Sequence, residues 1–234
     1  MPRYPEALDY ANRAIAMAPD QPWPYLVKAF NYWSWKGSSQ EARSALAFVP
    51  KEHEWYLWVR YWQEMFYGRY REAVERLESS REEWIRQKMW AVPKALFAGL
   101  AHEMLRETRM AGADYQLARQ LLEAELARQP DDPRYHSSLG IAYAALGRKD
   151  EAIREGRRAT ELLPLEADAF CALGHLRDLA VIYTAVGEDA AALKEIEHLL
   201  SIPSWVSPAW VLNDPQFARL KEDPRLTALL SRFR

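Results

Sequence analysis

The amino-acid sequence predicts an all-α protein, an α-solenoid of antiparallel helix pairs with a C-terminal helical cap. Residues 132–164 have the apolar spacing of two short helices joined by a tight turn at Gly147. Gly147 recurs forty residues later as Gly187, and Ala152 recurs as Ala192. Strand signals are weak, because the 234 residues include nine glycines and no Asn-Gly or Asp-Gly pair. Repetition of a helical unit is therefore the main signal.

Composition excludes several classes of protein. The chain is 49% hydrophobic and 27% charged, as in an ordinary globular protein, and its formal charge of -2 argues against nucleic-acid binding. Its most apolar stretch is too short for a membrane span, and the N-terminus lacks the apolar core of a signal peptide. The single cysteine, Cys171, fits a reducing compartment, so a cytoplasmic protein is expected.

Five helices are expected in the first third of the chain. Gly37 is expected to end the second helix, because a residue without a side chain suits a left-handed cap. Ser38 and Ser39 are expected to cap the third helix and Pro50 to end it. The expected ranges are 4–18, 21–35, 38–49, 52–67 and 70–79.

The middle and second half continue the helical pattern. Residues 80–109 are expected to be a long helical stretch in which Pro93 marks a break or a helix start. Residues 110–114 are expected to form a looser turn before a helix over 115–128. Asp132 and Pro133 suit the N-cap and the first turn of the next helix. Further helices are expected over 166–185 and 189–200.

The tail carries two more helix starts. Asp214-Pro215 and Asp223-Pro224 are each followed by an apolar pattern, which predicts two short helices. We therefore expect residues 1–204 to be an array of about five helix pairs, the first incomplete, and residues 205–234 to be capping helices of the same domain.

The unit at residues 132–164 resembles a tetratricopeptide repeat (TPR). Gly156 departs from the family pattern, which has a bulky apolar residue there, so looser packing is expected in that unit. The resemblance implies a right-handed superhelix of helix pairs, and weaker copies fit 23–50, 54–81, 94–130 and 173–203. The residues that carry it are His136, Leu139, Gly140, Tyr143, Gly147, Ala152, Ala159 and Pro164.

The second half resembles a narrower group, the C-terminal TPR arrays of bacterial multidomain signalling proteins. In those proteins the array follows a serine/threonine kinase, a nucleotide cyclase or a DNA-binding segment. This chain has no glycine-rich phosphate loop and no HRD or DFG triplet. The helix expected at 4–18 resembles the second half of a repeat, so the chain is expected to be a fragment or a shortened relative of a longer protein.

In the TPR family the first helix of each pair lines a concave surface. Trp55, Trp58 and Trp62 share one helix face by their spacing alone, and such a stripe suits either a peptide-binding surface or a buried core. The resemblance assigns the following residues to the partner-binding surface: Lys28, Tyr32, Trp55, Trp58, Trp62, Phe66, His102, Arg106, Arg134, Ser137, Ile141 and Arg177.

Three functions remain open from the sequence. The first is a non-enzymatic scaffold that binds a protein or peptide on its concave face. The second is a binder or enzyme for a small ligand such as a sugar, using the tryptophan-rich first half. The third is self-association through the unpaired first helix as a homodimer. No cofactor or metal is expected, because Cys171, His175 and His198 fall short of the four ligands of a structural zinc site.

Overall fold

The computed structural model describes residues 3–233, and within them the predicted all-α fold is confirmed. Met1, Pro2 and Arg234, at the outer ends of the two predicted segments, lie outside the described residues. The helices are α1 (Tyr4–Met17), α2 (Pro22–Lys36), α3 (Gln40–Leu46), α4 (Tyr56–Phe66), α5 (Tyr70–Glu78), α6 (Lys94–Met104), α7 (Thr108–Arg128), α8 (Pro133–Ala145), α9 (Lys149–Leu162), α10 (Ala172–Ala185), α11 (Asp189–Ser201), α12 (Pro208–Asn213), the 3-10 helix η1 (Pro215–Glu222) and α13 (Pro224–Ser231). Among residues 3–233, no helix has both the length and the apolar character that crossing a membrane requires.

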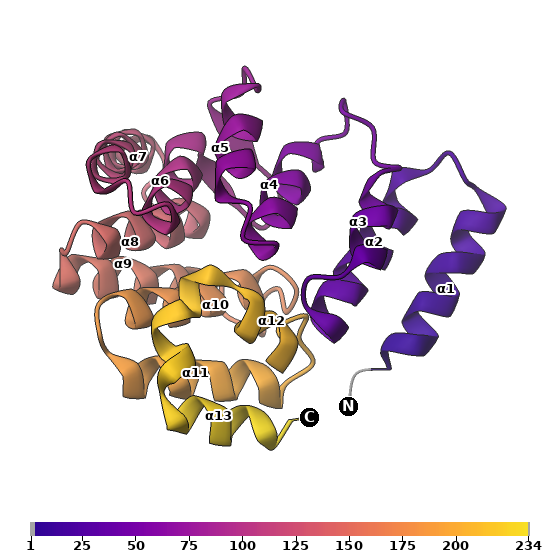
Figure 1. Cartoon of the computed structure of the whole chain (residues 1–234). Coiled ribbons are helices and arrows are strands. Elements are labelled where there is room, and N and C mark those ends of the chain that lie inside the picture. Colours follow the sequence, from indigo (N-terminus) through magenta and orange to yellow (C-terminus); the bar gives the residue numbers. More distant parts are fainter. Residues whose placement is uncertain (1–2, 234) are drawn as a thin grey trace.

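Helices that are adjacent in the sequence pack against each other in pairs. The pairs are α2 with α3, α4 with α5, α6 with α7, α8 with α9 and α10 with α11, and α1 packs on α2. The pairs follow one another around an arc, and α12 lies between α10 and the α2–α3 pair (Figure 1). The C-terminal segment thus connects the two ends of the arc.

The turn inside each pair contains one residue with positive φ. Its residue with positive φ is followed five positions later by a buried alanine, which lets the second helix lie close to the first. Four of these turn residues are glycines, which adopt positive φ without steric cost, and the exception is Arg106 at 60°. The turn residues are Gly37, Gly68, Arg106, Gly147 and Gly187, and the alanines are Ala42, Ala73, Ala111, Ala152 and Ala192.

Most predicted helix starts are confirmed. The Ser39 hydroxyl accepts the amide of Ala42, and the Asp132 carboxylate accepts the amide of Arg134. Asp214 and Asp223 cap η1 and α13 in the same way, each with proline as the next residue. These caps were predictable because a side-chain acceptor satisfies an otherwise free amide at the helix start.

The prediction of helix over residues 80–93 is wrong. Residues Trp84–Arg86 (β1) and Ala91–Pro93 (β2) form an antiparallel hairpin, in which Ile85 pairs with Val92. Tertiary contacts stabilise the hairpin, because β2 is buried against α6, α7 and α8. Pro93 does mark a helix start, since α6 begins at Lys94.

Three other local predictions are wrong. Residues 110–114 lie inside α7, and α10 begins at Ala172 because Asp168 accepts amides from Phe170 and Cys171 in a turn before it. The packing at Gly156 is close: a Cβ built there would lie 2.7 Å from Ile182 Cδ1. Ile182 of α10 therefore fills the space that a side chain at position 156 would occupy.

Candidate functional site

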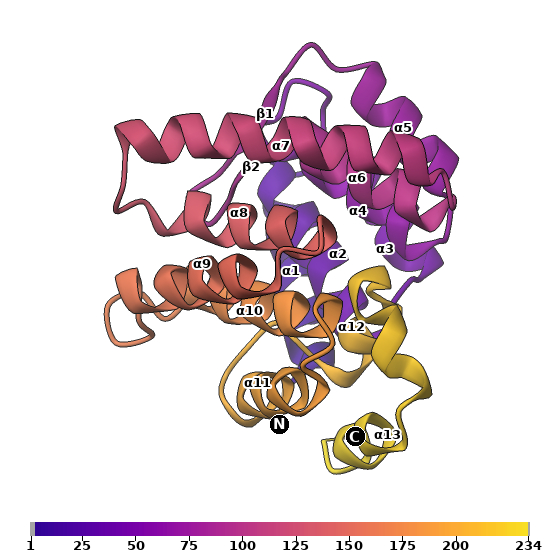
Figure 2. The same cartoon turned by 90° about the vertical axis from the view of Figure 1, so that its left-hand side faces the viewer.

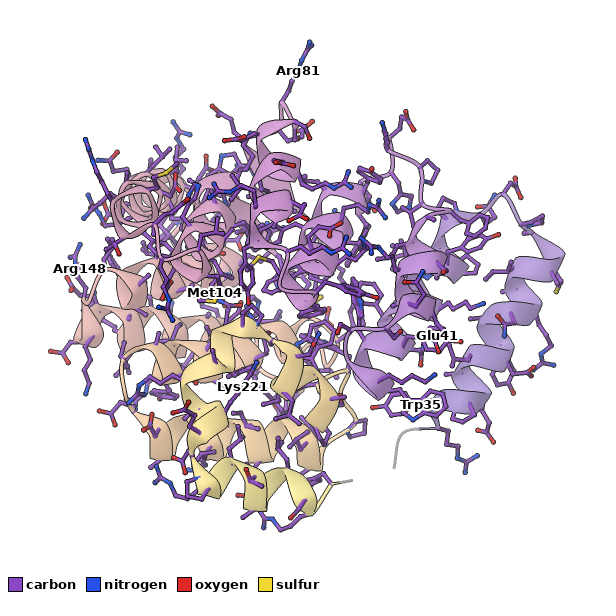
Figure 3. The ribbon with its side chains drawn as sticks, viewed as in Figure 1. Trp35, Glu41, Arg81, Met104, Arg148 and Lys221 are labelled. Carbon is purple, nitrogen blue, oxygen red and sulfur yellow. The ribbon has the colours of Figure 1, made fainter. Side chains whose placement is uncertain are left out.

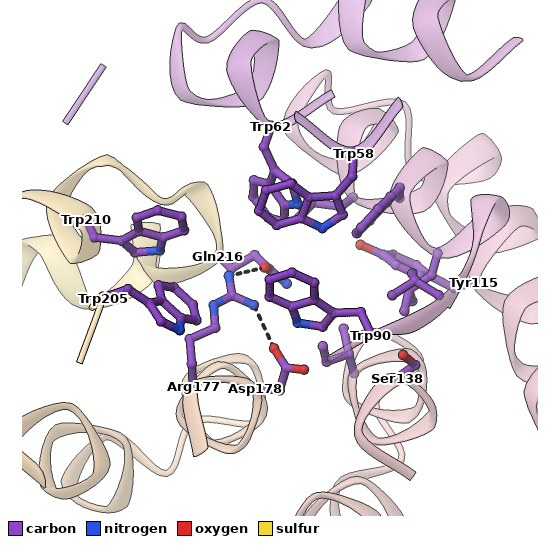
Figure 4. Close-up of a pocket in the computed structure, with 15 residues that line it drawn as sticks. Trp58, Trp62, Trp90, Tyr115, Ser138, Arg177, Asp178, Trp205, Trp210 and Gln216 are labelled. Atoms are coloured by element: carbon purple, nitrogen blue, oxygen red, sulfur yellow. Dashed lines mark hydrogen bonds and ion pairs between the residues drawn. The ribbon is translucent and has the colours of Figure 1, made fainter. Parts of the chain in front are cut away.

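Five tryptophans meet at the centre of the arc and form the tryptophan cluster (Figure 4). Trp58 stacks on Trp90 with ring centroids 4.8 Å apart and an interplanar angle of 17°. Trp205 and Trp210 meet edge to face, also at 4.8 Å. Trp62 stands beside Trp58 on α4, at 6.2 Å. Three separate segments of the chain therefore supply the cluster: α4, the turn of the β1–β2 hairpin, and the C-terminal end.

Helix α4 presents its tryptophan stripe to the interior. Trp58 and Trp62 are 4% and 5% exposed, and Trp55 is 9% exposed. Residues three and four apart lie on one face of a helix, which explains the shared direction of the stripe. The stripe is therefore buried, and Trp205 and Trp210 from the far end of the sequence line the same cavity.

Arg177 of α10 lies beside the tryptophan cluster and is paired with two carboxylates. Its guanidinium donates to Asp178 at 2.8 Å and also to Asp214 and Gln216, and it lies 5.6 Å from the Trp62 ring centroid. Burial alone would lower the pKa of Arg177, but the carboxylates of Asp214 and Asp178 raise it above its ordinary value. The buried arginine is therefore held in its charged form.

The C-terminal segment, residues 202–217, attaches to both ends of the arc. At the first end, the Ser34 hydroxyl donates to the carbonyl of Trp205, and the Ser207 hydroxyl donates to the carbonyl of Ser34. The Trp210 ring meets Phe66 edge to face at 5.0 Å. At the other end, Asp214 is fully buried against Arg177. The segment is thus held by hydrogen bonds from serine hydroxyls to main-chain carbonyls, an aromatic anchor and an ion pair.

Little free space remains between these side chains. The cavity among the tryptophans has a volume of about 50 Å³, whereas a buried cavity that binds benzene measures about 150 Å³. Of the described residues that line it, one is a carboxylate, Asp178, and its two oxygens accept from Arg177 and Ser137. Two carboxylates converging beside the tryptophans would favour the small-ligand or sugar alternative, and the described lining contains one.

The structure brings together a subset of the residues that the resemblance assigned to the partner-binding surface. Around the tryptophan cluster lie Trp55, Trp58, Trp62, Phe66, Ser137, Ile141 and Arg177. The remaining assigned residues lie elsewhere. Lys28 donates to Asn12 of α1, and Tyr32 has the Lys36 ammonium 5.4 Å from its ring.

Three assigned residues of the third and fourth pairs, His102, Arg106 and Arg134, are also separate from the cluster. His102 is buried and bonded through Nδ1 to Asp114 at 2.6 Å, and Arg106 is an exposed turn residue. Arg134 contacts Asp132 and donates to the carbonyl of Gln87 at 3.1 Å. His102 and Arg134 thus bind neighbouring elements, and Arg106 forms the turn between α6 and α7.

The sequence interpretation missed the residues that complete the centre. Trp90 was assigned to a helix, and Trp205 and Trp210 were placed in a cap rather than at the centre of the molecule. One signal was present. Residues 203–210 carry two tryptophans between prolines and serines, and large apolar side chains in such a segment indicate that it is buried against another part of the chain.

The described part of the chain has no group of three or more histidine, cysteine, aspartate or glutamate side chains placed to hold a metal ion. Comparison with protein-family models and with curated proteins finds no match for the chain. The function is therefore inferred from the geometry of the chain itself.

Proposed function

We propose that the chain is a non-enzymatic, TPR-like helical-repeat scaffold that binds a peptide segment on the inner side of its array. The array is residues 1–204, and residues 205–234 cap it. The positive-φ residue that recurs in each turn and the alanine that follows it support a superhelical repeat. Repeats of this kind present a continuous surface built from the first helices of successive pairs.

The C-terminal segment carries the proposal, because it is bound to the inner side in the manner of a peptide ligand. Its contacts combine the elements of peptide recognition: hydrogen bonds to the main chain, aromatic anchors in a pocket, and a charge pair. The array therefore has a surface suited to a tryptophan-containing segment with an aspartate downstream. We propose that a partner segment of this chemistry replaces the C-terminal segment.

The first experiment weakens the resident segment and offers the same segment as a separate peptide. The variant is Trp210→Ala, and the probe is a fluorescein-labelled peptide of residues 203–217. We expect saturable binding to the variant and little to the unchanged chain, since the peptide supplies the side chain that the variant lacks. Fluorescence anisotropy measures the binding.

A matched peptide with alanine at both tryptophans tests whether the aromatic anchors are required, and it should not bind. Ser207→Ala provides a milder variant, because it removes one hydrogen bond to Ser34 and the cap of α12. If neither variant binds the peptide while circular dichroism shows both folded, the inner side is a structural core and the proposal is wrong.

A further inference from the structure

The β1–β2 hairpin has one strand inside and one outside. Strand β2 lies between β1 and α8, with β1 on the far side (Figure 2). Ile85 is buried, while Arg86 is exposed. Because the two-stranded sheet ends at β1, this strand has an edge with no neighbouring strand.

The outward backbone groups of β1 are those of Trp84 and Arg86. In an antiparallel pair, hydrogen-bonded and non-bonded residue pairs alternate. Lys94 N–H donates to Glu83 O at 2.8 Å, and Gln87 N–H donates to Trp90 O at 2.7 Å. The residues between them, Trp84 and Arg86, therefore direct their amides and carbonyls away from β2, and these groups make no hydrogen bond within residues 3–233.

A wide groove runs along this edge, with a volume of about 1060 Å³. One wall is the loop at 51–54 with the start of α4, and the other is formed by the end of α5 and the residues leading into β1. The groove lies on the outside of the array and is separate from the tryptophan cluster. Its volume slightly exceeds the roughly 300–1,000 Å³ of ligand sites, so a short extended segment fits.

The charges in the groove favour a basic occupant. Arg76 and Arg86 are paired with Glu64 and Glu125, which lie outside the groove. Arg81 projects away from the molecule and makes no ion pair within the described residues (Figure 3). Against Lys51 and Arg81, the lining has four glutamates without an ion-pair partner among the described residues: Glu52, Glu54, Glu82 and Glu83.

We propose that an extended, lysine- or arginine-containing peptide segment adds to β1 as a third strand. Its backbone would pair with the amides and carbonyls of Trp84 and Arg86, and its cationic side chains would lie among the groove glutamates. Strand addition of this kind takes its affinity from main-chain hydrogen bonds and its selectivity from side chains at alternate positions.

The test uses the full chain and a heptapeptide of alternating lysine and valine. We expect saturable binding with a Kd below about 1 mM, measured by isothermal titration calorimetry. A peptide of alternating glutamate and valine, and the lysine peptide N-methylated at alternate amides, should each bind at least about tenfold more weakly, since they reverse the charge or block the strand edge. The N-methylated peptide keeps the charge, so it separates strand pairing from nonspecific attraction.

Matched variants at Arg86 test the strand edge from the side of the chain. Arg86→Pro removes an outward amide that the hairpin does not use, and Arg86→Ala removes the same side chain but keeps the amide. We expect the proline variant to bind about fivefold to tenfold more weakly than the alanine variant. If Arg86→Pro binds as tightly as Arg86→Ala, or if N-methylation has no effect on the unchanged chain, the proposal is wrong.

Discussion

The helix pairs of the second half and those of the first half are packed in different ways. Between α8, α9 and α10 the helices approach through glycine: a Cβ built on Gly140 would lie 2.6 Å from Ile182 Cδ1. Between α4 and α6 they are separated by rings, with Tyr61 stacked on Phe97 at 4.5 Å. The glycine contacts of the second half leave no room for a larger side chain, whereas large aromatic side chains fill the space between the helices of the first half.

This difference explains where the chain needs its C-terminal segment. Helices in close contact complete their interface within neighbouring pairs. Trp205 and Trp210, from the end of the sequence, line the same cavity as the tryptophans of α4 and contact Trp33, Phe66 and Trp90. The aromatic half thus depends on a contact distant in sequence, while the glycine-packed half depends on local ones.

The largest expected effect comes from breaking the ion pair that ties the C-terminal segment to α10. Asp214→Ala leaves Arg177 buried with one carboxylate instead of two, and we expect a loss of about 3–5 kcal/mol in the free energy of unfolding. Urea denaturation followed by circular dichroism measures the loss. Asp223→Ala is the matched control, because it removes an equivalent cap from α13 without a buried arginine partner. Equal losses in the two variants would contradict the importance of the pair.

A second change tests the close packing of the other half. Gly140→Ala should cost about 1–3 kcal/mol, since the added methyl collides with Ile182 and the backbone of α9. Gly112→Ala is the control: it lies within α7 with no atom within 4 Å of the added carbon. That variant should gain about 0.5–1 kcal/mol through helix propensity. Thermal unfolding of both variants checks the opposite signs.

Two histidines should respond to pH in opposite directions. Burial lowers the pKa of His175, so the unfolded chain takes up a proton more readily and stability falls as the pH drops below about 6.5. Burial also opposes the charged form of His136, but hydrogen bonds to Glu155 and the Pro130 carbonyl outweigh it and raise its pKa. Stability from His136 is therefore present at low pH and lost as the pH rises through its folded pKa.

Stability against pH in the variants His175→Leu and His136→Gln separates these contributions. The first should reduce the loss of stability on acidification, and the second should remove the loss on raising the pH through the folded pKa of His136. A pH profile of His175→Leu identical to that of the unchanged chain would show that His175 does not cause the acid sensitivity.

The smallest expected effect concerns the turn that departs from the others. Arg106 is the one described non-glycine residue with positive φ, a conformation that costs an ordinary residue about 1–2 kcal/mol. Arg106→Gly relieves this cost but adds freedom to the unfolded chain, so a net gain of about 0.5 kcal/mol is expected. Chemical denaturation should show a slightly higher midpoint, and a lower midpoint would mean that the Arg106 side chain makes a stabilising contact.

The sequence predicted the parts of the fold that local chemistry determines. Local effects of this kind act through a residue's own backbone conformation or its nearest amides, so they can be predicted from the sequence. Examples are Gly37, Gly147 and the aspartate-proline helix starts. The hairpin at 84–93 was missed because its residues include good helix formers such as Arg86 and Met89. Its strand conformation comes from burial of β2 against three helices, which is a tertiary effect.

For the candidate site, the sequence predicted only which face of a helix carries the tryptophans. The spacing of Trp58 and Trp62 placed them on one helix face, and the structure confirms that shared face. What covers that face could not be inferred, because Trp205 and Trp210 lie more than 140 residues away in the sequence. A periodic pattern identifies the apolar side of a helix and carries no information about a distant partner.

Native-state amide hydrogen exchange tests most directly whether the C-terminal segment is a separable occupant of the array. We expect the amides of α12 and η1 to exchange through a local opening, with a free energy of opening below that of the amides in α8 and α9. Under the same conditions, helices α8 and α9 should exchange only when the whole chain unfolds. An equal free energy of opening for α12, η1, α8 and α9 would mean that the C-terminal segment is an inseparable part of one core.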